Sequence, residues 1–175
     1  MNCPSCGAPM RLEEDQDSFH CEYCKNIFFP EKNEEGVRVL GEPSGLNCPV
    51  CSTGLVHAAI GGGRILYCTG CRGMLIRMDI FPGLIQAAQA HREGPAIIPH
   101  RPDPNGLRRH IKCPQCHASM NTHFYAGPGN IIIDSCSDCY LDWLDDGELM
   151  RIVRAPDRVY GESLPDMPPD LNARD

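Results

Sequence analysis

The sequence is poor in the residues that build a large hydrophobic core or cross a membrane. Aromatic residues make up 6% of the chain, and Trp143 is the single tryptophan. Apolar stretches such as Asn130 to Ile133 and Phe81 to Ala90 fall well short of the roughly 20 residues that a membrane helix needs. The residues before the first cysteine do not form a leader of the kind that directs export. We therefore expect a soluble, cytoplasmic protein without membrane attachment.

Unpaired cysteines are also lacking. The twelve cysteines fall into six Cys-x-x-Cys pairs, which are Cys3/Cys6, Cys21/Cys24, Cys48/Cys51, Cys68/Cys71, Cys113/Cys116 and Cys136/Cys139. An even number of cysteines is compatible with disulfides in an exported protein, but the reducing cytoplasm favours free thiolates. We therefore interpret the cysteines as metal ligands.

Two such pairs can form one tetrahedral site. A Cys-x-x-Cys turn places two sulfurs on the same side of a tight loop, and a hairpin brings a second turn opposite the first. Spacers of fourteen, sixteen and nineteen residues separate the two pairs of successive modules, and a proline inside each first pair restricts its turn. The pattern predicts three Zn²⁺ ions, each held by the four cysteines of one module.

This spacing also predicts the fold class. It divides the chain into segments too short for a self-sufficient core. We predict a small metal-stabilised fold of mainly β hairpins with short helices, in which three tandem four-cysteine zinc ribbons take the place of a large single core. The expected segments are ribbon 1 at residues 1–42, ribbon 2 with a trailing helix at 46–92, a Pro/Arg/His-rich linker at 93–112, ribbon 3 with a trailing helix at 113–154 and a disordered tail at 155–175.

Local signals in ribbon 2 predict a hairpin and a helix. The triple glycine at residues 61–63 indicates the tip of the hairpin between the two cysteine pairs. Beyond Cys71, apolar residues recur with helical spacing from Phe81 onward. Asp79 is the expected N-cap of this helix and Pro82 lies in its first turn.

Ribbon 3 carries comparable signals. Residues 131–133 are three isoleucines and predict a strand. Asp145 and Glu148 stand three residues apart, as in a capping box at the start of a helix. We expect Trp143, just before that helix, to cover the zinc knuckle and to pack on the helix.

The cysteine pattern leaves other uses of the thiols open. Four thiolates leave a tetrahedral ion no position for water, so we expect no enzymatic activity. Iron in a rubredoxin-like site is the main alternative metal. Thiol redox exchange is a second alternative, although that motif needs a strand-helix setting with one active pair. The ribbons could also share ligands, for example Cys21/Cys24 with Cys48/Cys51, but local pairing keeps each loop more compact.

A basic excess is absent as well. The formal net charge is −7, and zinc bound to thiolates would take it to about −13, because each four-thiolate site carries about −2. Nucleic-acid affinity depends mainly on lysine and arginine at phosphates, so we favour a protein partner. The alternative is nucleic-acid binding through the basic linker, although charged linkers are usually solvated tethers. The candidate phosphate contacts there are Arg101, Arg108, Arg109 and Lys112.

The third module carries a resemblance to a known family. The stretch from Cys136 to Leu149 ends in Trp-Leu-Asp-x-Gly-Glu-Leu and resembles the bacterial zinc-finger family related to the zinc ribbon of transcription factor IIB. That family usually has glycine two residues after the last cysteine, where this chain has Leu141. Ribbon 2 resembles the family more weakly, and ribbon 1 matches only a general zinc ribbon. The resemblance implies a zinc-binding fold and no particular activity.

Overall fold

Antiparallel strands and short helices make up the regular structure. A computed structural model describes residues 1–13, 17–92, 94–99 and 103–156, and most of the expected tail lies outside the described residues. The strands are β1 (Arg11–Glu13), β2 (Ser18–His20), β3 (Ile27–Phe28), β4 (Arg38–Asn47), β5 (Gly54–Ile60), β6 (Gly63–Tyr67), β7 (Met74–Arg77), β8 (Asn121–Phe124), β9 (Ile132–Cys136) and β10 (Leu141–Leu144). The helices are α1 (Phe81–Ala90), the 3-10 helix η1 (Pro104–Arg108) and α2 (Glu148–Val153). In this part of the chain, no helix has the length and apolar character needed to span a membrane.

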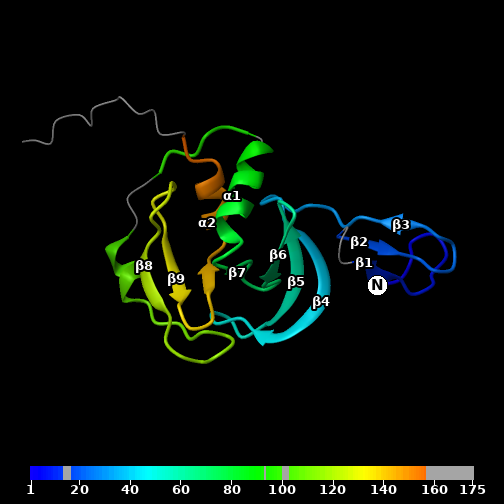
Figure 1. Ribbon diagram of the computed structural model, residues 1–175, viewed down its shortest axis with the longest axis horizontal. Helices are drawn as coiled ribbons and strands as arrows, with labels where there is room; N and C mark the ends of the chain where they lie inside the picture. The colour runs from blue at the N-terminus through cyan, green and yellow to red at the C-terminus, as the bar shows by residue number, and fades with distance from the viewer. Residues whose placement is uncertain (14–16, 93, 100–102, 157–175) are drawn as a thin grey trace, which may run out of the picture.

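Ribbon 1 forms a small sheet of its own, with the order β1-β2-β3 (Figure 1). Its buried residues include Met10, Phe19 and Leu40, which cluster with Cys3 and Cys21. A cluster of this size cannot stabilise an isolated domain, so the cysteines must contribute to its stability.

Ribbons 2 and 3 build one seven-stranded antiparallel sheet with the order β4-β5-β6-β7-β10-β9-β8 (Figure 1). β7 follows the last cysteine pair of ribbon 2, β10 follows that of ribbon 3, and the two strands pair from Leu141–Arg77 to Leu144–Met74. Strand β4 starts inside the segment expected for ribbon 1 and crosses the expected boundary between residues 42 and 46. The sheet therefore joins the modules, because β7 and β10 satisfy each other's backbone edges.

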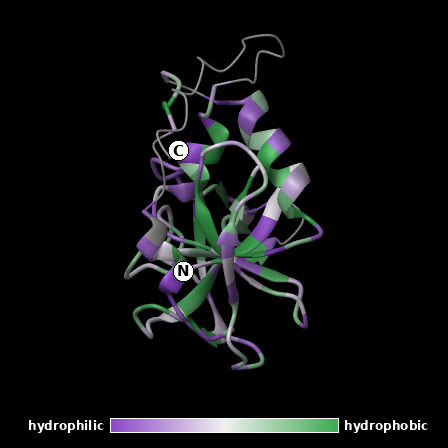
Figure 2. Ribbon diagram, turned by 90° about the vertical axis from the view of Figure 1, so that its left-hand side faces the viewer, coloured by the Kyte–Doolittle hydropathy of each residue, from purple (hydrophilic) through white to green (hydrophobic). Residues whose placement is uncertain are grey.

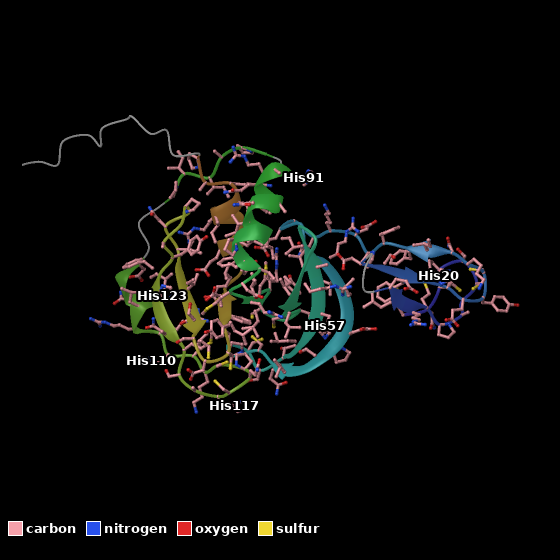
Figure 3. All side chains as sticks on the ribbon, in the orientation of Figure 1. His20, His57, His91, His110, His117 and His123 are labelled. Atoms are coloured by element: carbon pink, nitrogen blue, oxygen red, sulfur yellow. The ribbon has the colours of Figure 1, made fainter. Side chains whose placement is uncertain are left out.

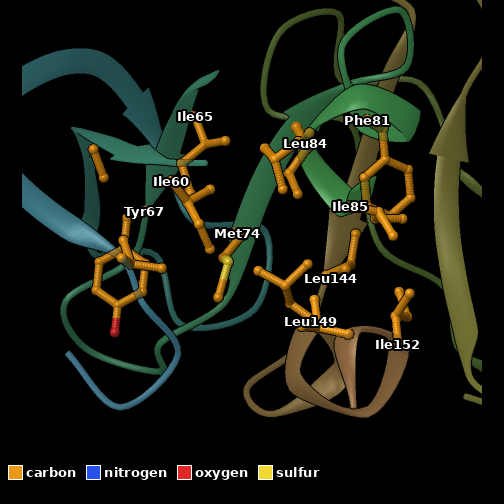
Figure 4. Packing of buried hydrophobic residues seen from close by; sticks show 14 of the residues in the cluster. Ile60, Ile65, Tyr67, Met74, Phe81, Leu84, Ile85, Leu144, Leu149 and Ile152 are labelled. Atoms are coloured by element: carbon orange, nitrogen blue, oxygen red, sulfur yellow. The ribbon is translucent and has the colours of Figure 1, made fainter. Parts of the chain in front are cut away.

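Both α-helices pack on one face of this sheet. Figure 4 shows Phe81, Leu84 and Ile85 of α1 close to Leu144 of β10 and Ile152 of α2, and all five belong to one buried cluster. Each side chain of this size contributes about 1.5–3 kcal/mol when it is fully buried. Figure 2 shows hydrophobic residues along the strands and both hydrophobic and hydrophilic residues on α1, as a helix covering a sheet requires.

The predicted fold class is confirmed. The described chain is mostly β with short helices, and its buried apolar residues form three separate clusters in place of one large core. The hairpin tip is also confirmed, because Gly61 and Gly62 connect β5 to β6 with φ angles of 56° and 80°. Glycine adopts these positive φ angles without the steric cost that other residues incur.

Two expectations about loops are corrected. Asp79 is not the N-cap of α1: Ile80 holds that position, and the Asp79 carboxylate instead lies 2.5 Å from the Arg77 guanidinium. The segment before ribbon 3 is not simply an extended tether, because residues 104–108 form η1. The Ile97 N–H also donates to the Arg154 carbonyl at 2.8 Å, which attaches this segment to the end of α2.

Candidate metal centres

The twelve cysteines lie in three groups of four, one in each ribbon. Within each group all four sulfur atoms are within 4.8 Å of one another. Figure 3 shows the first group in the ribbon that carries His20, well apart from the sulfur atoms near His117. The structure therefore places the cysteines according to local pairing, and it does not bring Cys21/Cys24 together with Cys48/Cys51.

The spacing of the sulfurs fits a tetrahedral metal ion. The Sγ atoms of Cys3 and Cys24 are 3.6 Å apart, those of Cys48 and Cys71 are 3.5 Å apart, and those of Cys116 and Cys136 are 3.6 Å apart. Four sulfurs at about 2.3 Å from a central Zn²⁺ would be separated by about 3.8 Å in a tetrahedron. Each group is therefore close to the geometry of a four-cysteine site that could hold a metal ion.

Each cysteine pair is shaped by a left-handed residue that directly follows it. These residues and their φ angles are Gly7 (75°), Lys25 (61°), Ser52 (62°), Arg72 (63°), His117 (62°) and Tyr140 (55°). In five of the pairs the N–H of this residue donates to the carbonyl of the pair's first cysteine, as from Ser52 to Cys48 at 3.0 Å. Only Gly7 of these six residues is a glycine, so the sequence does not indicate the left-handed conformation at the other five positions.

Backbone N–H groups also point at the sulfurs. The N–H groups of Val50 and Cys51 lie 3.4 and 3.5 Å from Cys48 Sγ, and the N–H of Cys71 lies 3.4 Å from Cys68 Sγ. Hydrogen bonding with the Thr53 side chain and backbone lowers the pKa of Cys51 to about 6, whereas burial raises the pKa of Cys48. Because only the thiolate binds metal, an incoming ion must displace the remaining protons.

The second and third sites share a hydrophobic cluster. In this cluster the buried Leu75 of β7 and Trp143 of β10 lie among the buried cysteines of both ribbons, which are Cys48, Cys68, Cys113 and Cys136. A Cβ atom at Gly73 would lie only 2.2 Å from Trp143 Cζ2, so the absence of a side chain there lets the ring approach ribbon 2. Sequence reasoning missed this relationship, because nothing local to ribbon 2 indicates a partner for Gly73.

Trp143 covers the cysteine group of ribbon 3 as expected, but it does not pack on the following helix. Its side chain is completely buried, and it clusters with the cysteines instead of with the α2 residues Leu149 and Ile152. Residues 141 and 143 of a strand point to the opposite face from residues 142 and 144, so the ring lies across the sheet from the helix. The Trp143 Nε1–H donates to Asp145 Oδ1 at 3.0 Å.

Asp145 is the centre of a polar network beside the third site. The Arg109 guanidinium donates to both Asp145 oxygens and lies 3.7 Å from the buried Asp134 carboxylate. Only half of the predicted capping box is present: Glu148 Oε2 accepts from the Asp145 N–H at 2.8 Å, but Gly147, and not Asp145, is the N-cap of α2. Burial raises the pKa of Asp134 and raises the pKa of Glu148 to about 7.

The proposed phosphate contacts have different surroundings. Arg108 and Lys112 are exposed, Arg109 is engaged by Asp145 and Asp134, and Arg101 lies outside the described residues. From the sequence, Arg109 was expected in an extended linker. Its two carboxylate partners lie 36 and 25 positions later, and no residue near Arg109 indicates that it will pair with them. The structure therefore gives Arg109 surroundings that differ from those of Arg108 and Lys112.

Comparison with known proteins supports the assignment of ribbon 3. A family model described as a transcription factor zinc-finger, of the TFIIB zinc-ribbon type, matches residues 112–155. The match covers the third cysteine group together with β8, β9, β10 and α2. No curated protein and no solved structure was found to match the chain. Residues 112–155 are thus similar to a zinc ribbon of the TFIIB type, and the matched segment does not extend to ribbons 1 and 2.

Proposed function

We propose that this chain is a non-enzymatic zinc protein whose three four-cysteine sites stabilise surfaces that bind another protein. The observation that carries this proposal is the grouping of all twelve cysteines into three sets whose sulfurs lie within 4.8 Å of one another. An ion with four sulfur ligands has no position open to water or substrate, which favours a structural role for the metal.

Zinc is favoured over iron and over redox exchange. The family that matches residues 112–155 is described as a zinc-finger family, which supports zinc at the third site. The other two groups have the same ligand set and similar sulfur spacing. A reducing, cytoplasmic setting is part of the proposal, because all twelve cysteines are free thiols in the structure.

The metal content of the full chain tests the structural half of the proposal. We expect about three zinc ions per chain after purification without added metal, and loss of the circular dichroism signal on chelation. Iron in the protein, or chelator-resistant folding with disulfides, would contradict the proposal and favour the redox alternative.

Binding of a partner tests the other half. The metal-loaded chain and the chelated chain are each immobilised, and candidate proteins that bind only the loaded form are purified and recombined with it. A direct complex of two purified proteins at physiological salt is the expected result. Capture that disappears after nuclease treatment would show that nucleic acid mediates it.

Nucleic-acid binding remains the second candidate because Arg108 and Lys112 are exposed and because the matching family is described as a transcription factor zinc-finger. A net charge of −7 opposes it. A salt-sensitive mobility shift with DNA or RNA that is lost in the double variant Arg108→Glu, Lys112→Glu would support this candidate. Arg109 is unsuitable for the test, since its removal would disturb the network around Asp145.

A further inference from the structure

A cleft of about 660 Å³ opens where ribbon 2 meets ribbon 3. We call it the junction cleft. Its apolar part is formed by Leu46, Leu66, Leu75 and Leu141, and its polar rim includes Arg64 and Arg77. Such a volume is within the range of roughly 300–1,000 Å³ that is typical of ligand sites.

The cleft arises from an interruption in the sheet. β6 and β7 pair only at Leu66–Leu75 and Tyr67–Met74, although β6 continues along β5 as far as Gly63 and β7 continues along β10 as far as Arg77. The two strands therefore part beyond Leu66 and Leu75. Arg64 lines the cleft from the β6 side, and Arg77 lines it from the β7 side.

The rim carries two arginines, and Arg77 is the more exposed of them. Arg64 and Arg77 line the cleft together with one acidic residue, Asp79, and Arg64 also pairs with Asp17 at 3.0 Å. The Arg77 and Asp79 side chains form an ion pair but remain 67% and 55% exposed. Exposed ion pairs of this kind contribute little to stability, so a carboxylate from a ligand can compete for Arg77.

The apolar part of the cleft favours a peptide over a nucleic acid as its ligand. Leucine side chains bury apolar groups but do not provide the aromatic faces on which bases stack. Tyr140 is the aromatic residue of the lining, and it is 67% exposed. A ligand that matches both parts of the cleft therefore carries apolar side chains for the leucines and carboxylates for the rim.

We propose that the junction cleft binds a short segment of a partner protein in which large apolar residues stand next to aspartate or glutamate. This inference rests on the proposed function as a protein-binding module and adds the chemistry of the partner. It does not depend on which metal the cysteine groups hold.

The test uses the full metal-loaded chain and three labelled peptides of equal length. One alternates leucine with aspartate, one replaces the leucines by serine, and one replaces the aspartates by lysine. Fluorescence anisotropy measures binding, and amide chemical shifts of the ¹⁵N-labelled chain locate it. We expect the leucine–aspartate peptide alone to bind and to shift the amides of Leu66, Leu75 and Leu141.

Two matched variants test the rim. Arg77→Glu should weaken binding of the leucine–aspartate peptide by about tenfold or more, because it replaces an attraction by a repulsion next to an apolar site. Arg108→Glu makes the same charge change at an exposed position outside the cleft and should leave binding within about twofold. Equal weakening by both variants would overturn the proposal, since it would reflect overall charge.

Other outcomes would also overturn it. Absence of binding by the leucine–aspartate peptide at millimolar concentration, equal binding of the serine peptide, or displacement by single-stranded DNA would each exclude this occupant. Shifts at the cleft residues that depend on protein concentration without peptide would assign the cleft to a second copy of the chain. Shifts on deleting residues 157–175 would assign it to the chain's own C-terminal segment. Metal analysis of the same sample keeps this failure distinct from failure of the zinc proposal.

Discussion

Leu75 and Trp143 lie directly opposite each other across the β7–β10 pair, and each is the fourth residue after the last cysteine of its ribbon. In each flanking pair, Met74–Leu144 and Ile76–Asp142, one residue is the third after the last cysteine of its ribbon and the other is the fifth. Strands β7 and β10 are therefore related to each other by an approximate two-fold axis that passes between Leu75 and Trp143. Ribbons 2 and 3 therefore contribute equivalent residues to this strand pair.

The close approach of Trp143 to Gly73 predicts a strong effect of a single methyl group. Gly73→Ala should destabilise the chain by about 1–3 kcal/mol, because the ring must move away from the new Cβ atom. Thermal unfolding followed by circular dichroism measures the change. Gly54→Ala is the matched control, since no atom lies within 4 Å of a Cβ built there. In a Trp143→Leu background, Gly73→Ala should lose most of its effect, and full additivity would contradict the contact.

The shared cluster around Leu75 and Trp143 predicts that the second and third sites depend on each other. Cys68→Ser should lower the metal content by more than one ion per chain or shift the emission of Trp143, because both sites border the same cluster. Cys21→Ser should remove one ion and leave the emission of Trp143 unchanged, since Cys21 lies in the separate cluster of ribbon 1. Identical effects of the two substitutions on Trp143 would argue against the coupling.

The polar network beside the third site predicts different roles for two adjacent arginines. Arg109→Ala should cost about 2–4 kcal/mol, because it leaves the buried Asp134 and the half-buried Asp145 without their cation. Arg108→Ala, at an exposed neighbour, should change the free energy of unfolding by less than about 0.5 kcal/mol. Denaturant titration of both variants measures the difference, and equal stabilities would show that the Arg109 contacts contribute nothing.

Glu148 predicts a pH dependence of stability. Burial raises the pKa of Glu148 to about 7, above the ordinary glutamate value of about 4.3, so the folded chain holds this proton more tightly than the unfolded chain. The resulting stability is present below the unfolded pKa and is lost as the pH rises through 7. Glu148→Gln retains an oxygen that can accept from the Asp145 N–H but carries no charge. It should therefore gain about 1–2 kcal/mol over the natural chain at pH 8 and less at pH 5.5.

The exposed Glu31 provides the control for that comparison. Glu31→Gln should change the free energy of unfolding by the same small amount at both pH values. Comparing chains at one pH removes the common effect of proton competition at the cysteines. A Glu148→Gln difference that does not vary with pH would show that this carboxyl does not govern the pH dependence.

The sequence by itself determined the cysteine groups, the hairpins that bring each group together and the existence of the trailing helices. These features depend on residues close to one another along the chain: two cysteine pairs with a short spacer, glycines at a hairpin tip, and Glu148 three residues after Asp145. Each ribbon can satisfy such local requirements without reference to the others, which is why the fold class and the grouping of the sulfurs followed from spacing.

Only the tertiary structure decided how the ribbons combine. The β7–β10 pairing, the burial of Trp143 against Gly73, the engagement of Arg109 by Asp134 and Asp145 and the junction cleft all join residues that are far apart in the chain. Strand partners and registers are chosen by side chains on both strands, and one sequence segment does not specify its distant partner. The same holds for the half-buried Arg109, whose charge indicates a surface position until its two carboxylate partners are known.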